Sequence, residues 1–178
     1  KNVNKQCQYL SKTIEDFRSF FHKNSIYVET FYLKDAFTEL KNISNKMFKD
    51  NFINLHIEIE DCPITENRNL FVQSILNIFN NAKDAMVINN IPPEERYFFI
   101  NVEKKNNKVL FRFLDSGGGI DEKIIDNVFE PYSTTKHQSQ GTGLGLYMTY
   151  QVINMHLKGN ISVENKTYEY DGKKQKGA

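Results

Sequence analysis

Residues 141–146 read Gly141-Thr142-Gly143-Leu144-Gly145-Leu146, and the interpretation of the whole chain starts from this stretch. Three alternate glycines leave the backbone bare, so that N–H groups can approach phosphate oxygens before a helix opens. The apolar pattern that follows predicts this helix from about Gly143 to Leu157. A tight turn uses the same residues, so a phosphate cradle and a turn remain alternatives for the stretch taken alone.

The bulk composition limits what the chain can be. Its 178 residues, 39% hydrophobic and 25% charged, suffice for one core with a small extension. The net charge of +1 provides no field for a polyanion, so we expect no nucleic acid partner. No apolar run reaches the roughly 20 residues that span a bilayer, and we expect no membrane contact. Cys7 and Cys62 lack metal-site spacing, which favours a reducing compartment, the cytoplasm, and a role as small buried hydrophobes.

The first 21 residues carry a heptad pattern. Apolar side chains recur at alternating intervals of four and three, at Val3, Cys7, Leu10, Ile14, Phe17 and Phe21. This pattern predicts a helix whose seam packs on another helix, either in a second copy of the chain or before Lys1. A helix that lies on its own domain is the alternative. We divide the chain into this helix, residues 1–24, and a domain of residues 25–178.

The domain alternates irregularly between helical and strand periods. We expect a short strand at 31–33, a helix at 35–49 with Phe37, Leu40, Ile43 and Met47 inward, a strand at 54–60 stopped by Pro63, a helix from Thr65 to about Asn89, strands at 96–103 and 108–114 joined by an Asn106-Asn107 turn, and a strand at 161–163. The tail from Asp171 is polar. This order predicts an α/β sandwich, a mixed sheet of about five strands covered on one face by about three helices and preceded by one helix.

The helix from Thr65 carries a stripe of short polar side chains. Gln73, Asn77, Asn81 and Asp84 fall within roughly 80° of one another on a helical wheel, opposite an apolar face. A solvated face is the alternative, but such faces normally carry Lys and Glu, and short amides are poor helix formers. The stripe therefore indicates a polar ligand, and carboxamide oxygens at this spacing suit Mg²⁺ or its water shell.

A carboxylate beside three glycines follows the strand at 108–114. Asp115-Ser116-Gly117-Gly118-Gly119-Ile120 could accept a hydrogen bond from a planar ring pressed against the bare backbone, such as the amino group of adenine. An Asx turn is the alternative, although it needs only one or two glycines. The inward side of the preceding strand is either Leu110, Arg112 and Leu114 or its complement.

Aromatic residues precede a polar segment between the two glycine stretches. Phe129-Glu130-Pro131-Tyr132 would anchor a mobile loop at residues 133–140. Within this loop, Lys136 is a candidate point charge for a terminal phosphate, with an inert surface lysine as the alternative.

Together these four segments resemble the nucleotide-binding domain of two-component sensor histidine kinases, within the wider superfamily of gyrase and mismatch-repair ATPases. Residues 76–85 resemble its N box, residues 115–120 its first glycine box, residues 129–132 its F box and residues 141–146 its second glycine box, in the same order. Residues 8–21 also resemble the second helix of the family's dimerisation hairpin. The resemblance implies a Bergerat-type ATP-binding fold, with a further strand beyond Ala178.

The resemblance also implies roles for individual residues. Asn77 and Asn81 would bind Mg²⁺, Asp115 would receive the adenine amino group, and Lys136 would lie beside the γ-phosphate, so that Asn77 and Lys136 are the catalytic candidates. Residues 133–140 would form a lid whose base is pinned by Phe129 and Tyr132. The remaining candidate ATP contacts are Asp84, Gly117, Gly119, Ile120, Gly141, Thr142, Gly143, Leu144, Gly145 and Leu146.

The family's phosphoacceptor histidine is usually followed by an acidic residue. His22, His56, His137 and His156 are followed by Lys23, Ile57, Gln138 and Leu157, so none fits this pattern. We therefore expect a histidine kinase fragment that transfers the γ-phosphoryl group of ATP to a histidine outside this chain, within a homodimer that serves a response regulator. The alternatives are an ATP-hydrolysing conformational ATPase, disfavoured because Asn77 stands where such enzymes have a glutamate, and a non-catalytic nucleotide-dependent interaction module.

Overall fold

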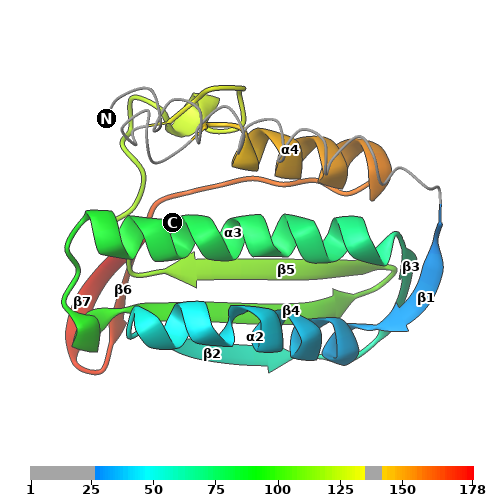
Figure 1. The fold of residues 1–178 in the computed structure, drawn as a ribbon, viewed down its shortest axis with the longest axis horizontal. Helices are drawn as coiled ribbons and strands as arrows, with labels where there is room; N and C mark the ends of the chain where they lie inside the picture. Colours follow the sequence, from blue (N-terminus) through cyan, green and yellow to red (C-terminus); the bar gives the residue numbers. More distant parts are fainter. Residues whose placement is uncertain (1–26, 135–141) are drawn as a thin grey trace, which may run out of the picture.

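The computed structural model describes residues 27–134 and 142–178 (Figure 1). Its elements are β1 (Glu29–Tyr32), α2 (Leu33–Asp50), β2 (Asn54–Ile59), β3 (Pro63–Glu66), α3 (Arg68–Ile88), η1 (Pro93–Glu95), β4 (Tyr97–Lys105), β5 (Lys108–Asp115), η2 (Ile125–Asn127), α4 (Gly145–Gln151), the π-helical turn η3 (Val152–His156), β6 (Lys166–Tyr170) and β7 (Lys173–Gly177). The predicted helix at residues 1–24 and its division from the domain lie outside these ranges.

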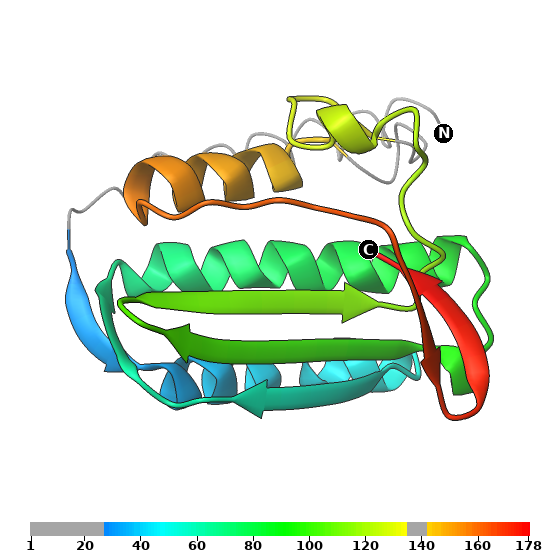
Figure 2. The ribbon, with the colours of Figure 1, turned by 180° about the vertical axis from the view of Figure 1, so that it is seen from behind.

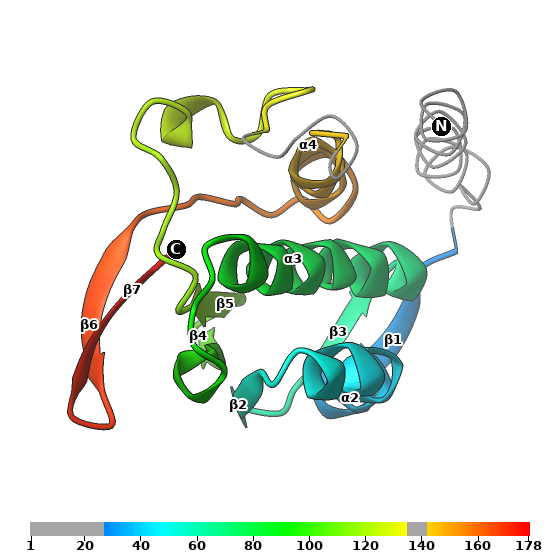
Figure 3. The same ribbon diagram turned by 60° about the vertical axis from the view of Figure 1, so that its left-hand side comes forward.

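A mixed sheet forms the centre of the domain. Strand β4 pairs in parallel with β2 and antiparallel with β5. Helices α2 and α3 cover one face of this sheet, and α4 packs on α3 (Figures 1 and 3). The predicted α/β fold class is confirmed. Within the described ranges the central sheet has three strands, and four further strands form two separate antiparallel pairs, β1–β3 and β6–β7.

The β6–β7 hairpin lies at one end of the sheet, on the side away from α2 and α3 (Figures 2 and 3). A long segment without strand pairing connects η3 to β6 and runs beside α4 (Figure 2). The hairpin thereby reaches the carboxyl end of β5, where the Asp115 N–H donates to the Ala178 carbonyl at 3.3 Å. The end of the chain and the first glycine loop consequently share one corner of the fold.

Aromatic side chains join the helices to the sheet. Phe79 of α3 lies 5.4 Å from Phe48 of α2 and 5.4 Å from Phe98 of β4, measured between ring centroids. A second group joins Phe37 of α2 and Phe71 of α3 to Phe111 of β5. Because Phe111 faces the helices, the inward side of β5 is the complement of Leu110, Arg112 and Leu114.

Several sequence predictions hold in detail. Leu55, Ile57 and Ile59 of β2 pack against the core, as their alternation predicts. The β4–β5 turn consists of Asn106 and Asn107, and Asn106 has a positive φ of 53°. Cys62 is a buried free thiol.

Other predictions are wrong. Thr65 does not begin a helix, because residues 63–66 form β3 against β1, and the cap of α3 is Asn67, whose Oδ1 accepts from the Leu70 N–H at 3.1 Å. Ile43, predicted to face inward, is 54% exposed. Residues 161–163 do not form a strand, although burial alternates along them, because no strand pairs with them in the described ranges. The polar tail from Asp171, for which we predicted no strand, contains β7.

No helix in the described part of the chain combines the length and the apolar character needed to span a membrane.

Candidate functional site

The polar stripe of α3 faces α4. Its four side chains, Gln73, Asn77, Asn81 and Asp84, belong to half-buried residues. The amide Nδ2 of Asn77 lies 3.4 Å from Thr149 Oγ1 on α4, and Asn81 Nδ2 lies 4.0 Å from the position of a Cβ built on Gly145. At Asn77 and Asn81 the stripe is therefore an interhelical surface and not a solvated face.

Asp84 lies at the end of this stripe and forms an ion pair with Lys83. The two side chains are 27% and 24% exposed, respectively. A carboxylate already paired with a neighbouring cation is a weaker candidate for a nucleotide contact than the amides beside it.

The first glycine loop packs on α3 one turn beyond Asn81. A Cβ on Gly117 would lie 2.6 Å from the Ala85 Cβ, so only glycine permits this approach. The Asn89 side chain at the end of α3 donates to the Gly117 carbonyl at 2.5 Å. The first glycine loop thus contacts the same helix, α3, that carries the Asn77 and Asn81 amides. One nucleotide could therefore contact both.

Asp115 ends β5 at the base of this loop. Its Oδ1 accepts a hydrogen bond from the Gly117 N–H at 2.7 Å. Burial raises the pKa of the carboxyl to about 6, against the opposing effect of the backbone N–H groups of Gly117 and Ala178. The phenol of Tyr168 donates to the Asp115 carbonyl at 3.0 Å, and its own pKa is raised, chiefly by burial and further by the Asp115 charge. A desolvated carboxylate in such a corner is a strong hydrogen-bond acceptor.

The second glycine box leads into α4, whose first two residues, Gly145 and Leu146, belong to the box. Gly143 has a φ of 65°, and a Cβ there would lie 2.6 Å from the backbone of Tyr132. The Thr142 hydroxyl accepts from the Leu144 N–H at 3.3 Å. Leu144 is buried and Leu146 is half-buried. The side chain of Leu144 therefore packs in the interior of the protein. Gly141 and Lys136 lie outside the described residues.

The F box meets α4 through Phe129, whose ring centroid lies 5.4 Å from that of Tyr150. We expected Tyr132 to hold the base of the lid, but its side chain does not pack against the second glycine box. Its side chain is 71% exposed, and the contact to the second glycine box is made by its backbone N–H, which donates to the Gly143 carbonyl at 3.0 Å. The lid residues 135–140 lie beyond the described ranges.

Sequence reasoning missed the residues that hold the first glycine loop from the far end of the chain. The Asn165 side chain exchanges two hydrogen bonds with the backbone of Ile120, each 2.7 Å long. The Gly118 N–H donates to the Lys176 carbonyl at 2.9 Å. A Cβ on Gly177 would lie 1.7 Å from the Asp115 carbonyl oxygen. No local pattern signals these contacts, because they join segments more than 40 residues apart.

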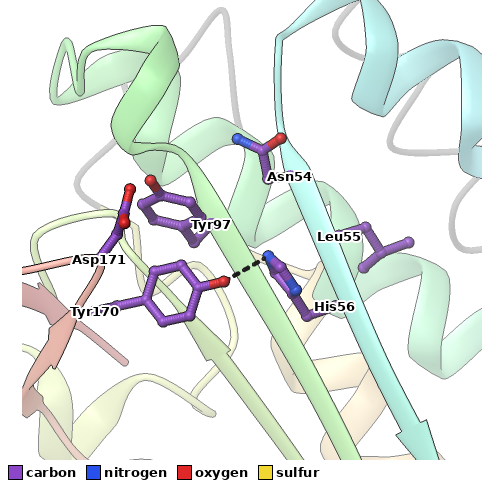
Figure 4. A pocket seen from close by; sticks show the side chains of 6 residues that line it. All are labelled: Asn54, Leu55, His56, Tyr97, Tyr170 and Asp171. Carbon is purple, nitrogen blue, oxygen red and sulfur yellow. Dashed lines mark hydrogen bonds between the residues drawn. The ribbon is translucent and has the colours of Figure 1, made fainter.

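A separate hollow lies on the opposite side of the sheet (Figure 4). It has a volume of about 410 Å³ and is lined by Asn54, Leu55, His56, Tyr97, Tyr170 and Asp171. The Tyr170 hydroxyl and His56 Nε2 lie 3.3 Å apart, and the His56 ring stacks on Phe99 with centroids 4.9 Å apart. These contacts anchor the β6–β7 hairpin to the sheet, in keeping with a structural role for His56.

The described residues contain no cluster of three or more His, Cys, Asp or Glu side chains that could hold a metal ion. The side-chain amide oxygens of the α3 stripe are groups that can bind a hard cation or its water shell.

Residues 66–177 match the family described as "Histidine kinase-, DNA gyrase B-, and HSP90-like ATPase", and the chain belongs to this family. The predicted resemblance of this chain to the ATP-binding catalytic domain of sensor histidine kinases is confirmed. The signal transduction histidine-protein kinase AtoS of Escherichia coli is 33% identical over 107 residues, which cover 60% of this chain and 16% of that protein. The chain spans between 13 and 18% of the length of the curated relatives it matches.

Solved structures support the same fold. The catalytic domain of histidine kinase ThkA aligns with a TM-score of 0.63 at 24% identity, covering 84% of this chain and 92% of that one. Histidine kinase ThkA in complex with response regulator protein TrrA aligns with a TM-score of 0.61 at 18% identity, covering 99% of this chain and 51% of that one.

Proposed function

We propose that this chain is the ATP-binding catalytic portion of a sensor histidine kinase. It would bind Mg²⁺-ATP along α3 and transfer the γ-phosphoryl group to a histidine outside these 178 residues. The proposal rests on one observation: both glycine boxes contact α3. Asn81 faces Gly145 of the second glycine box, and Ala85, one turn further along the helix, contacts Gly117 of the first glycine box. Amides and bare backbone therefore meet along one surface.

Each group has a role suited to its surroundings. Asp115, desolvated at the base of the first loop, would accept the adenine amino hydrogen. Asn77 and Asn81 would bind Mg²⁺ or its waters, and Gly143, Gly145 and Gly141 would lie against the phosphates. Lys136 would neutralise charge at the γ-phosphate, beneath a lid formed by residues 133–140. Mg²⁺ held by these amides would offset the charge of the phosphates.

The protein would contribute positioning and charge stabilisation more than covalent chemistry. The bond between the γ-phosphorus and the bridging oxygen breaks, a bond to an imidazole nitrogen forms, and ADP leaves. An acidic residue next to the acceptor histidine would receive the imidazole proton. None of the four histidines of this chain has such a neighbour, which supports an acceptor elsewhere.

Steady ATP hydrolysis is the weaker alternative. A hydrolase of the superfamily needs a glutamate where this chain has Asn77, whose side chain is hydrogen-bonded to Thr149. An amide cannot remove a proton from water in the way a carboxylate does. A non-catalytic nucleotide-dependent module is the second alternative, and phosphotransfer distinguishes it.

The assembly follows from the same proposal. Residues 1–24 would complete a dimerisation hairpin, and the protein would act as a homodimer in the cytoplasm. The complex of ThkA with a response regulator supports a response regulator as the partner here.

Phosphotransfer tests the proposal. A polypeptide that combines this chain with a helix carrying an acceptor histidine should incorporate label from γ-³²P-ATP in an acid-labile, alkali-stable form typical of phosphohistidine. An Asn81→Ala variant should lose at least nine-tenths of the label. Steady release of phosphate without labelled protein would support the hydrolase instead, and ATP binding with neither outcome would support the non-catalytic module.

A further inference from the structure

The first glycine loop is held at both ends by asparagine side chains from different parts of the chain. Asn89, which follows α3, donates to the carbonyl of Gly117 at 2.5 Å. Asn165, which precedes β6, accepts from the Ile120 N–H and donates to the Ile120 carbonyl, each at 2.7 Å. Residues 117–120 are thereby fixed between α3 and the β6–β7 hairpin.

The two residues between these anchors need the restraint most. Gly118 and Gly119 have φ values of 90° and 82°. Glycine adopts positive φ values about as readily as negative ones, so these two residues do not hold this conformation by themselves. The Asn165 carboxamide also lies against Gly119, since a Cβ there would be 2.7 Å from Asn165 Oδ1. A loop with two glycines that had to be ordered on ligand binding would cost affinity.

We propose that Asn165 is a positioning residue of the nucleotide site. It keeps residues 117–120 in the conformation that lets a planar base lie beside Asp115, without touching the nucleotide itself. This inference rests on the proposed function, because it assigns Asn165 to the same site. The segment that precedes β6 is then part of the binding machinery, whereas the turn of the β6–β7 hairpin is not.

The direction of its hydrogen bonds separates this role from simple hairpin stability. Both bonds of the Asn165 side chain that join the two segments end on the glycine loop, 45 residues away. The hairpin is also held by strand pairing and by the Tyr170–His56 contact on the other side of the sheet (Figure 4). The hydrogen bonds of Lys176 and Tyr168 to Gly118 and Asp115 do not involve the Asn165 side chain. Removing the Asn165 amide should therefore loosen the loop more than the hairpin.

ATP titration calorimetry in Mg²⁺, well below the unfolding temperature, tests the role. Asn165→Ala removes both bonds. Asn165→Asp keeps the acceptor for Ile120 N–H but replaces the donor that faces the Ile120 carbonyl. We expect the dissociation constant for ATP to rise about tenfold or more in Asn165→Ala and at least threefold in Asn165→Asp. At about 1.4 kcal/mol per tenfold, these rises correspond to at least about 1.4 and about 0.65 kcal/mol of binding free energy.

Gly172→Ala is the matched control. Gly172 lies in the β6–β7 turn with a φ of 69° and nothing within 4 Å of an added Cβ, so the substitution strains the hairpin without touching the loop. This variant should bind ATP as the wild type does, even if its unfolding midpoint falls as far as that of Asn165→Ala. An equal loss of affinity in Gly172→Ala and Asn165→Ala, or wild-type affinity in Asn165→Ala, would overturn the inference. Absence of ATP binding in the wild type would instead overturn the proposed function.

Discussion

Asn77 of α3 donates its side-chain amide to the hydroxyl of Thr149 of α4, with Nδ2 and Oγ1 3.4 Å apart. The same hydroxyl donates to the carbonyl of Gly145 at 3.0 Å, and Thr149 is only 1% exposed. One buried hydroxyl therefore ties the amide stripe of α3 to α4, the helix that begins within the second glycine box. The spacing between these two candidate nucleotide surfaces depends on this contact.

Replacing Thr149 by valine should separate the two surfaces. The Asn77 amide would lose its partner in a half-buried position, at a cost of about 1–2 kcal/mol in the free energy of unfolding. Urea unfolding measures this loss, and ATP affinity should fall with it because α4 carries the second glycine box. Thr149→Ser keeps the hydroxyl and is the control, expected to retain ATP affinity within about twofold.

Asp115 should make stability depend on pH. Its pKa is raised from 3.8 to about 6, so the folded state binds a proton more tightly than the unfolded state does. The resulting stabilisation is fully present below pH 3.8 and is lost as the pH rises through 6. Relative to Asp115→Asn, the wild type should lose on the order of 2–3 kcal/mol between pH 4 and pH 7. Parallel unfolding curves for the two proteins over this range would contradict the assignment.

The contact between Gly117 and Ala85 predicts a paired effect. Gly117→Ala would bring a methyl group to 2.6 Å from the Ala85 Cβ and push the first glycine loop off α3. We expect a tenfold or greater loss of ATP affinity, measured by titration calorimetry. Adding Ala85→Gly should restore part of this loss, whereas Ala85→Gly alone should cost about 1 kcal/mol of helix stability. A double variant no better than Gly117→Ala would show that the clash lies elsewhere.

Alanine substitutions at Gly177 and Gly172 compare two reasons why a position requires glycine: a steric clash of the added Cβ and a positive φ. A Cβ on Gly177 would lie 1.7 Å from the Asp115 carbonyl oxygen, whereas Gly172 has open space but a φ of 69°. Gly177→Ala should displace β7 from β5 and destabilise the domain by about 2 kcal/mol or more, within the range for overpacking. Gly172→Ala should cost about 1 kcal/mol. Thermal unfolding of both variants compares the two effects directly.

Periodicity predicted the faces of the main elements because burial repeats locally. Alternation in β2 correctly separated Leu55 from His56, and the helical wheel placed Asn77 and Asn81 on one side of α3. The first glycine loop and α3 could not be brought together from periodicity alone. Only the resemblance to a known family joined those segments at the sequence level.

The errors arose where long-range pairing decides the structure. Thr65 and Asn67 are both good helix caps, but residues 63–66 pair with β1, and the cap falls to Asn67. Residues 161–163 have the period of a strand but pair with no strand in the described parts of the chain, because half-burial alone produces the same pattern. The roles of Asn165 and Gly177 depend on where the β6–β7 hairpin packs. The alternation of Tyr168 and Tyr170 and the Asp171-Gly172 turn are typical of a hairpin but do not indicate its packing partner.

Titration of ATP into the wild type, Asn81→Ala and Asp115→Asn, each with Mg²⁺ and with EDTA, tests the central claim most directly. The account predicts wild-type binding that weakens on removal of Mg²⁺, a tenfold or greater loss in each variant, and a smaller effect of Mg²⁺ in Asn81→Ala than in the wild type. Equal affinity in all three proteins, with or without Mg²⁺, would contradict a site in which α3 amides and the Asp115 carboxylate hold one nucleotide.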